Sequence, residues 1–129
     1  MAKAQLVWKL SDDKQTVTLE MHIDGTPMAH MILEGAELEG LIHDLGKARS
    51  EMADPVTPEL DPGMRLEVLV DPVWRTMPEA EHNGSVLALR HPGLGWTSYF
   101  LPVKEARALA ASLTAQSEAL EAKSDPKQP

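Results

Sequence analysis

The chain has 129 residues, of which 43% are hydrophobic and 25% charged, a composition typical of one soluble globular domain. Twenty acidic and twelve basic side chains give a net charge of −8, which disfavours unselective electrostatic binding to nucleic acid or anionic lipid. Cysteine is absent, which excludes disulfides, thiolate metal sites and cysteine nucleophiles.

The N-terminal residues show no targeting signal. They reach Asp12 and Asp13 before any apolar run long enough for a signal peptide, and no stretch approaches the roughly 18 apolar residues of a membrane span. We therefore expect a cytoplasmic protein without a membrane segment.

The first half of the chain predicts three strands and a helix. A strand is expected from about Gln5 to Leu10, and residues 17–23 then alternate apolar and polar side chains. Asp24-Gly25 predicts a tight turn into a third strand over residues 28–33. The helix is predicted by apolar residues at helical spacing, with acidic residues near its positive end. These residues are Leu38, Leu41, Ile42, Leu45 and Met52, preceded by Glu34 and Glu37.

Residues 53–63 separate this unit from the next. They contain Pro55, Pro58 and Pro62, and proline at this density neither continues a helix nor enters a central strand. We interpret them as a linker.

The second half repeats the pattern. A strand is expected from about Met64 to Val70, with an extension to Trp74 left open, and a hairpin follows through the turn at residues 91–95. Pro102 suits the first turn of a helix, with Glu105 close behind it. The helix is predicted by apolar residues at positions 106, 109, 110, 113 and 120. Residues 123–129 lack an apolar anchor and predict a disordered tail.

The two halves are also related in sequence. At an offset of 68 residues, six positions of the first half are identical to their counterparts in the second, which indicates a duplicated unit at about residues 4–52 and 64–122. The alternative is two similar supersecondary motifs that arose independently. The identical pairs are Leu19 and Leu87, Gly25 and Gly93, Leu33 and Leu101, Glu37 and Glu105, Leu41 and Leu109, and Leu45 and Leu113.

Each βββα unit has one apolar sheet face and one apolar helix stripe, which it cannot bury alone. We therefore expect an α+β fold over residues 1–122, a single domain in which the two units pair about an internal pseudo-two-fold axis and form antiparallel sheets with two helices. In element order, and in the strand-to-helix joins at Leu33-Glu34 and Leu101-Pro102, this architecture resembles the PC4/Whirly-type single-stranded-DNA-binding folds. That resemblance implies paired units and a single-stranded nucleic-acid ligand, without assigning any binding residue.

Five histidines raise the question of a metal site. His22 and His30 are the nearest pair, but a two-residue turn at Asp24-Gly25 places them on opposite faces of the hairpin, and a one-residue slip in register reverses that. His43-Asp44 matches only the dipeptide of the HD phosphohydrolases, whose further ligands are missing. Glu79, Glu81 and His82 fall in a predicted polar loop without an identified acid–base partner. We expect no metal and no cofactor.

Nucleophile and phosphate-binding motifs are missing as well. No G-x-S-x-G elbow, Walker loop or G-x-G-x-x-G fingerprint occurs, and Gly93 and Gly95 are interpreted as turn residues. Asn83-Gly84-Ser85 matches a glycosylation sequon, but we interpret it as a hairpin bend. No catalytic residue is assigned, and the sequence predicts that the chain is not an enzyme.

Aromatic and basic side chains gather in the second half. Alternation places Trp96 and Phe100 on one strand face and Tyr99 on the other. Trp96 and Phe100 match Met28 and Ile32 of the first unit, which favours a core position for them. The candidate binding residues are Trp74, Arg75, Arg90 and Tyr99, with Arg90 and Tyr99 expected on the same face.

We predict a small non-enzymatic module that binds a protein partner or itself, favoured by seven methionines and by an acidic first half. Residues 1–62 hold 5 basic and 12 acidic side chains, and residues 63–129 hold 7 and 8. The alternative is a single-stranded nucleic-acid-binding protein, and a second alternative is a metal-dependent hydrolase that needs two histidines within ligand reach. Monomer and dimer are both open, since a free sheet edge can recruit a second copy.

Overall fold

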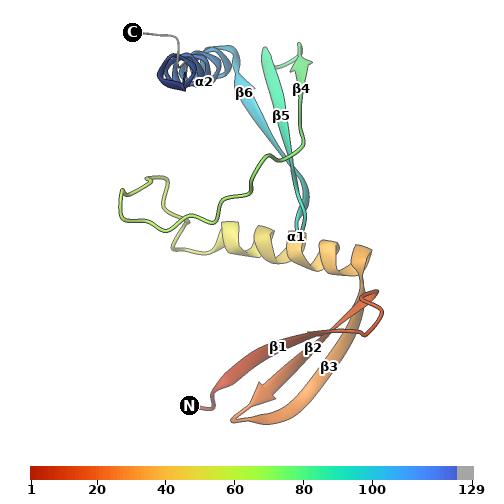
Figure 1. Ribbon diagram of the computed structural model, residues 1–129. Helices are drawn as coiled ribbons and strands as arrows, with labels where there is room; N and C mark the ends of the chain where they lie inside the picture. The colour runs from red at the N-terminus through yellow and green to blue at the C-terminus, as the bar shows by residue number, and fades with distance from the viewer. Residues whose placement is uncertain (125–129) are drawn as a thin grey trace. The chain divides into compact units, whose positions relative to one another are not determined.

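The computed structural model describes residues 1–124 and divides the chain into two compact units, Met1–Glu67 and the residues from Val68 onward. Each unit contains one antiparallel three-stranded sheet and one helix (Figure 1). The predicted α+β class with antiparallel sheets is therefore confirmed. The pairing of the units about a two-fold axis stays a prediction.

In the first unit the strands follow one another in the sheet as they do in the chain. Asp24 and Gly25 both have positive φ, 50° and 83°, as a two-residue hairpin turn requires, so the predicted turn is confirmed. The backbone N–H of Glu34 donates to Glu37 Oε1 at 3.0 Å, which caps the helix start where the acidic residues were expected. The elements are β1 Ala4–Leu10, β2 Thr16–Ile23, β3 Thr26–Glu34 and α1 Gly35–Glu51.

The second unit repeats this order and ends in the longer helix. Its β4–β5 turn contains Asn83 at φ 55°, and Gly95, the first residue of β6 after the β5–β6 turn, has φ 78°. The Nδ1 atom of His91 accepts hydrogen bonds from the backbone N–H groups of Gly93 and Leu94, at 2.9 and 3.0 Å. His91 and the Asn83-Gly84 bend thus have local structural roles. The elements are β4 Trp74–Glu79, β5 Gly84–His91, β6 Gly95–Pro102 and α2 Val103–Ser124.

The first strand of this unit lies later in the chain than expected. Residues 64–70 form no strand, and β4 begins at Trp74, where the alternative extension of the predicted strand ended. Pro78 lies within β4, which is an edge strand, because a missing N–H is tolerated where one side of the strand has no partner. The irregular connection therefore runs from residue 52 to residue 73 and not only over the proline-rich residues 53–63.

The ends of α2 also differ from the prediction. Pro102 is the last residue of β6 and precedes the helix, so it does not occupy the first helical turn. At the other end, α2 continues through Ser124, two residues into the predicted tail, because Glu121 and Lys123 are good helix formers. The rest of that predicted tail lies outside the described residues.

Within residues 1–124, Ala88 is the one buried apolar residue, at 8% exposure. Trp8 and Trp74 are 68% and 65% exposed, although each lies on a sheet face of alternating apolar residues. The strands and helices of both units thus have apolar residues at the expected spacing, but almost none of these residues is buried in a core.

Candidate binding faces

The second unit has an apolar face on which α2 lies against the strands. Cross-strand pairs Trp74 with Leu89, and Leu87 with Tyr99, project their side chains to this side of the sheet. Trp74, Leu87 and Leu89 on this face, together with α2, line a groove of about 520 Å³, which we call the α2 groove. It is lined mainly by Trp74, Leu87, Leu89, Leu101, Leu109 and Leu113, with Thr76 and Ser85 as its only polar side chains within the described chain.

The opposite face of the same sheet carries cations and aromatic rings, and we call it the Arg–Trp face. Arg90 pairs directly with Trp96 across β5 and β6, and Arg75 lies beside Ala88 on the neighbouring strand pair. Phe100 lies over Gly84 and meets the ring of His82 edge-on, with centroids 6.3 Å apart. Arginine beside exposed aromatic rings is an arrangement suited to stacking and charge neutralisation.

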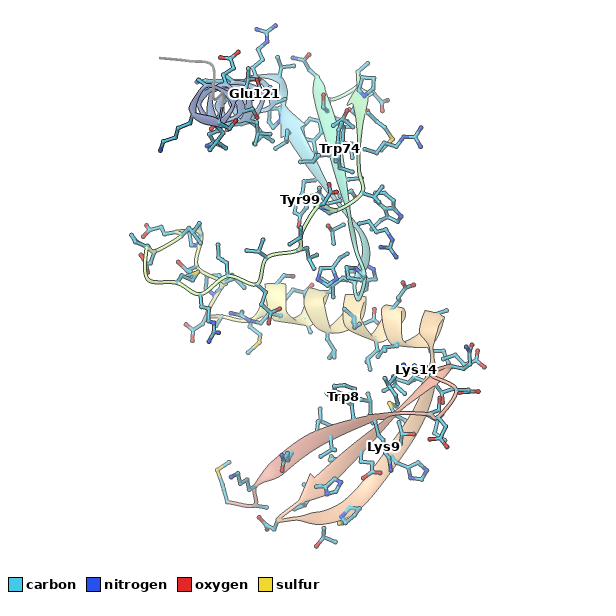
Figure 2. The ribbon with its side chains drawn as sticks, viewed as in Figure 1. Trp8, Lys9, Lys14, Trp74, Tyr99 and Glu121 are labelled. Atoms are coloured by element: carbon cyan, nitrogen blue, oxygen red, sulfur yellow. The ribbon has the colours of Figure 1, made fainter. Side chains whose placement is uncertain are left out.

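The strand register divides the four candidate residues of the sequence analysis between these faces, and Figure 2 labels two of them, Trp74 and Tyr99. Trp74 and Tyr99 belong to the face of the α2 groove, whereas Arg75 and Arg90 belong to the Arg–Trp face. The expectation that Tyr99 and Arg90 share a face is wrong, because the register pairs Arg90 with Trp96 and Tyr99 with Leu87. Trp96, 51% exposed, is not a core residue, so sequence reasoning missed it as a partner for Arg90.

The first unit also has one apolar sheet face. Trp8 pairs with Leu19, and Leu19 with Met31, so one row of apolar side chains crosses all three strands. A hollow of about 190 Å³ lies on this face between Leu6, Met21 and Met31. The face consists of Leu6, Trp8, Leu10, Val17, Leu19, Met21, Ala29, Met31 and Leu33.

The other face of this sheet corrects the placement of the histidines. A register shift between Met21 and His22 makes His22 oppose Pro27, while His30 still opposes Glu20. Because Glu20 and His22 alternate on β2, both histidines lie on the face of Glu20, and His22 Nε2 lies 2.8 Å from Glu20 Oε2. The bulge therefore reverses the predicted opposite-face arrangement, yet the three residues do not form a convergent ligand group.

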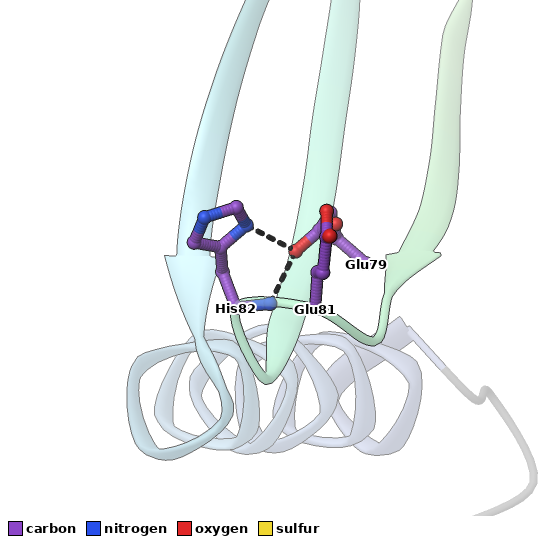
Figure 3. A group of neighbouring side chains, drawn as sticks. All are labelled: Glu79, Glu81 and His82. Carbon is purple, nitrogen blue, oxygen red and sulfur yellow. Dashed lines mark hydrogen bonds and ion pairs between the residues drawn. The ribbon is translucent and has the colours of Figure 1, made fainter.

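The convergent group in the described part of the chain is Glu79, Glu81 and His82, whose ligand atoms lie within 4.8 Å of one another (Figure 3). Glu79 lies at the end of β4, and its Oε2 accepts from the backbone N–H of His82 at 2.6 Å and lies 2.8 Å from His82 Nδ1. These bonds close the β4–β5 turn, which explains the cluster as a turn cap. His43 and Asp44 lie exposed on α1, outside this group.

In comparisons with protein-family models, curated protein sequences and solved structures, nothing matches the chain. The PC4/Whirly-type resemblance rests on the element order and stays a prediction. Neither helix in residues 1–124 combines the length and the apolar character needed to cross a membrane.

Proposed function

We propose that the chain is a non-enzymatic protein–protein interaction module whose binding surface is the apolar face of its βββα units, with the α2 groove as the principal site. The observation that carries this proposal is the exposure of the groove's apolar lining, which includes Trp74 and Leu113 at 65% and 56%. Aromatic anchors and large apolar side chains in a recessed surface are the usual centre of a protein interface.

The energetic argument supports a partner for this groove. Removing apolar surface from water contributes about 25 cal/mol for each Å², so several exposed leucines and a tryptophan offer several kcal/mol to whatever covers them. The lining has no charged side chain, and a partner therefore meets no desolvation penalty from an ion. An amphipathic helix fits this chemistry, because its apolar stripe matches a groove between a helix and a sheet.

This proposal is tested by panning a displayed library of amphipathic helices against the full chain, immobilised at low density so that neighbouring copies do not meet. We expect enriched peptides with an apolar stripe that lose binding to Leu89→Glu, which places a carboxylate in the groove. Arg90→Glu is the matched control, since it adds a carboxylate at the next position of β5 but on the opposite face. Enrichment of no peptide, or binding lost only in Arg90→Glu, would contradict the proposal.

A second candidate function is single-stranded nucleic-acid binding through the Arg–Trp face. Arg75 and Arg90 supply cations for phosphates, and the exposed rings of Trp96 and Phe100 supply stacking platforms. Residues 63–129 hold 7 basic and 8 acidic side chains, so the half of the chain that carries the Arg–Trp face adds little to the net negative charge of the protein.

Fluorescence anisotropy of a labelled single-stranded oligonucleotide, titrated at low and at moderate salt, tests this second candidate. We expect affinity that falls steeply with salt, quenching of tryptophan emission, and weaker binding by Arg90→Glu. Leu89→Glu serves here as the control, because it leaves the Arg–Trp face unchanged. Absence of binding at low salt, or an affinity independent of salt, would exclude this function.

A further inference from the structure

The chain exposes more surface than two compact domains of its mass. Its accessible surface is 11627 Å² for a mass of 14.1 kDa. Two separate compact domains of half this mass would expose roughly 8,100 Å² together, which leaves a surplus of about 3,500 Å² per chain. The exposed irregular residues 52–73 and the open sheet faces of both units share this surplus, and the apolar α2 groove is one part of it. Obligate dimers bury roughly 2,000–5,000 Å² over both chains.

The apolar stripe of α2 continues beyond the part that meets its own sheet. Leu109 and Leu113 line the α2 groove, but Leu120, two turns further along the same stripe, does not and is 67% exposed. The second unit therefore offers both an unfilled apolar groove and an apolar helix segment that no residue of its own sheet covers. These two features complement each other when two copies meet.

Charges on α2 are arranged so that the helix complements itself in the antiparallel direction. At helical spacing, Arg107, Glu118 and Glu121 lie on one side of the leucine stripe, and Glu105 and Lys123 lie on the other. When two such helices pack antiparallel across a two-fold axis, each side meets the same side of the partner helix. Arg107 then faces the acidic pair of the other copy, and Glu105 faces Lys123.

We propose, on the basis of the interaction function above, that a second copy of this chain covers the α2 groove. The two α2 helices pack antiparallel across a two-fold axis near Leu113, and each inserts its Leu120 segment toward the other's groove. All five charged residues named above are exposed and available for these pairs, and Figure 2 marks Glu121 on α2. The uncharged groove lining makes this self-contact free of like-charge repulsion at its centre.

Sedimentation velocity and light scattering of the full chain over a micromolar concentration series test the proposal. The expected species has about 28 kDa, twice the chain mass of 14.1 kDa. Arg107→Glu and Glu118→Arg should each raise the dimer dissociation constant about tenfold, because each reversal acts twice in a two-fold dimer. The double variant Arg107→Glu/Glu118→Arg restores opposite charges and should recover the wild-type constant to within about threefold.

Two controls separate pairing from folding. Lys47→Glu makes the same kind of charge reversal on α1 and should leave the dissociation constant unchanged. Leu113→Glu places two carboxylates at the axis and should give a monomer, with circular dichroism to confirm that the helices remain. The exposed charge reversals keep the proposal testable if Leu113→Glu fails to fold.

Binding of an apolar dye such as anilinonaphthalene sulfonate distinguishes the ways in which the proposal can fail. A wild-type monomer that binds the dye strongly overturns the second copy as the occupant but leaves the groove open to another protein, as the proposed function requires. A wild-type monomer that binds no dye has its α2 groove closed by residues of the same chain. This result overturns both the second copy as the occupant and the proposed interaction function. A dimer insensitive to Arg107→Glu and to the charge swap overturns the antiparallel α2 contact.

Discussion

The two units share one succession of strands and helix but display different chemistry on it. In the first unit, the one polar side chain that the register of the described strands places on the apolar sheet face is Thr26, beside Ile23, whereas the corresponding face of the second unit includes Thr76, Ser85 and Thr97 and is joined by α2 in a groove. The first unit carries most of the acidic excess of the chain, while the second has a sheet face with two arginines beside aromatic rings. A repeated backbone plan therefore does not imply a repeated binding surface.

The opposite faces of the sheets diverge in the same way. Glu20, His22 and His30 occupy this position in the first unit, and Arg75, Arg90 and Trp96 occupy it in the second. Since strand pairing depends on the backbone and on one apolar face, the other face is free to change its residues. The comparison indicates that a difference in binding selectivity between the two units comes from the residues on this second face of each sheet.

Gly84→Ala has the largest expected effect on stability, and this effect belongs to the second unit. A Cβ at this position would lie 2.5 Å from Phe100 Cζ and would also overlap the carbonyl oxygen of Leu101. We expect the second unit to lose about 3 kcal/mol of stability, because backbone and an aromatic ring must both shift. Urea unfolding in a Trp8→Phe background, where the remaining tryptophans all lie in the second unit, measures this loss.

Gly93→Ala is the control for this prediction. Its Cβ would meet His91 Cε1 at 3.5 Å, an ordinary van der Waals distance, and the effect should stay below about 1 kcal/mol. Equal losses from Gly84→Ala and Gly93→Ala would show that the close approach of Phe100 to β5 is wrong.

A smaller effect, confined to the first unit, is expected for Gly25→Ala. Gly25 has a φ of +83° in the β2–β3 turn, a conformation that alanine adopts only with strain, and the cost is about 1 kcal/mol. Unfolding followed by Trp8 fluorescence in a Trp74→Phe/Trp96→Phe background reports on this unit alone. Gly40→Ala, on α1 with no atom within 4 Å of the new Cβ, should instead stabilise it by roughly 0.5–1 kcal/mol. The same sign for both variants would contradict the turn geometry.

The sequence predicted the elements well where period and turn chemistry agree. The alternation over β2, the Asp24-Gly25 turn and the helical spacing of Leu38, Leu41 and Leu45 all led to the observed structure. It misplaced β4, because the apolar residues between Met64 and Val70 resemble a strand more than Trp74–Glu79, which contains a proline. An edge strand needs only one neighbour, and local propensity does not reveal which segment finds it.

The candidate binding faces were predicted less well, for a physical reason. A face is defined by register across strands, and neither the partner of Arg90 nor the bulge beside His22 is encoded in the period of one strand. Alternation along β6 correctly separated Trp96 from Tyr99, but it could not tell which of them joins Arg90. The sequence could have paired Trp96 with Arg90 by counting residues from the turn. His91 and Gly95 form the pair that closes the β5–β6 hairpin, and the next pair in the register is Arg90 and Trp96.

The smallest expected effect concerns the acid-capped turns that the units share. In the first unit, Asp13 Oδ1 accepts from the Ser11 hydroxyl at 2.7 Å and from the Gln15 backbone N–H at 3.1 Å, as Glu79 accepts from His82 in the second unit. The Ser11 hydroxyl, followed by the Gln15 N–H, lowers the pKa of Asp13 below its ordinary value of 3.8. Since the folded pKa lies below the unfolded one, the stabilisation is present above pH 3.8 and is lost as the pH falls through the folded pKa.

Carbon-detected NMR titration of the Asp13 carboxyl group measures this pKa directly. Ser11→Ala removes the larger cause, so the pKa should rise toward 3.8, whereas Ser50→Ala on α1, whose hydroxyl donates to the Lys47 carbonyl oxygen, should leave it unchanged. Asp13→Asn should reduce the acid-dependent part of the unfolding free energy of the first unit. The fluorescence of Trp74 and Trp96 should meanwhile show that the stability of the second unit is unchanged. An unchanged Asp13 pKa in Ser11→Ala would mean that the β1–β2 turn is held by its backbone alone and that the resemblance between the two turns ends at their position in the fold.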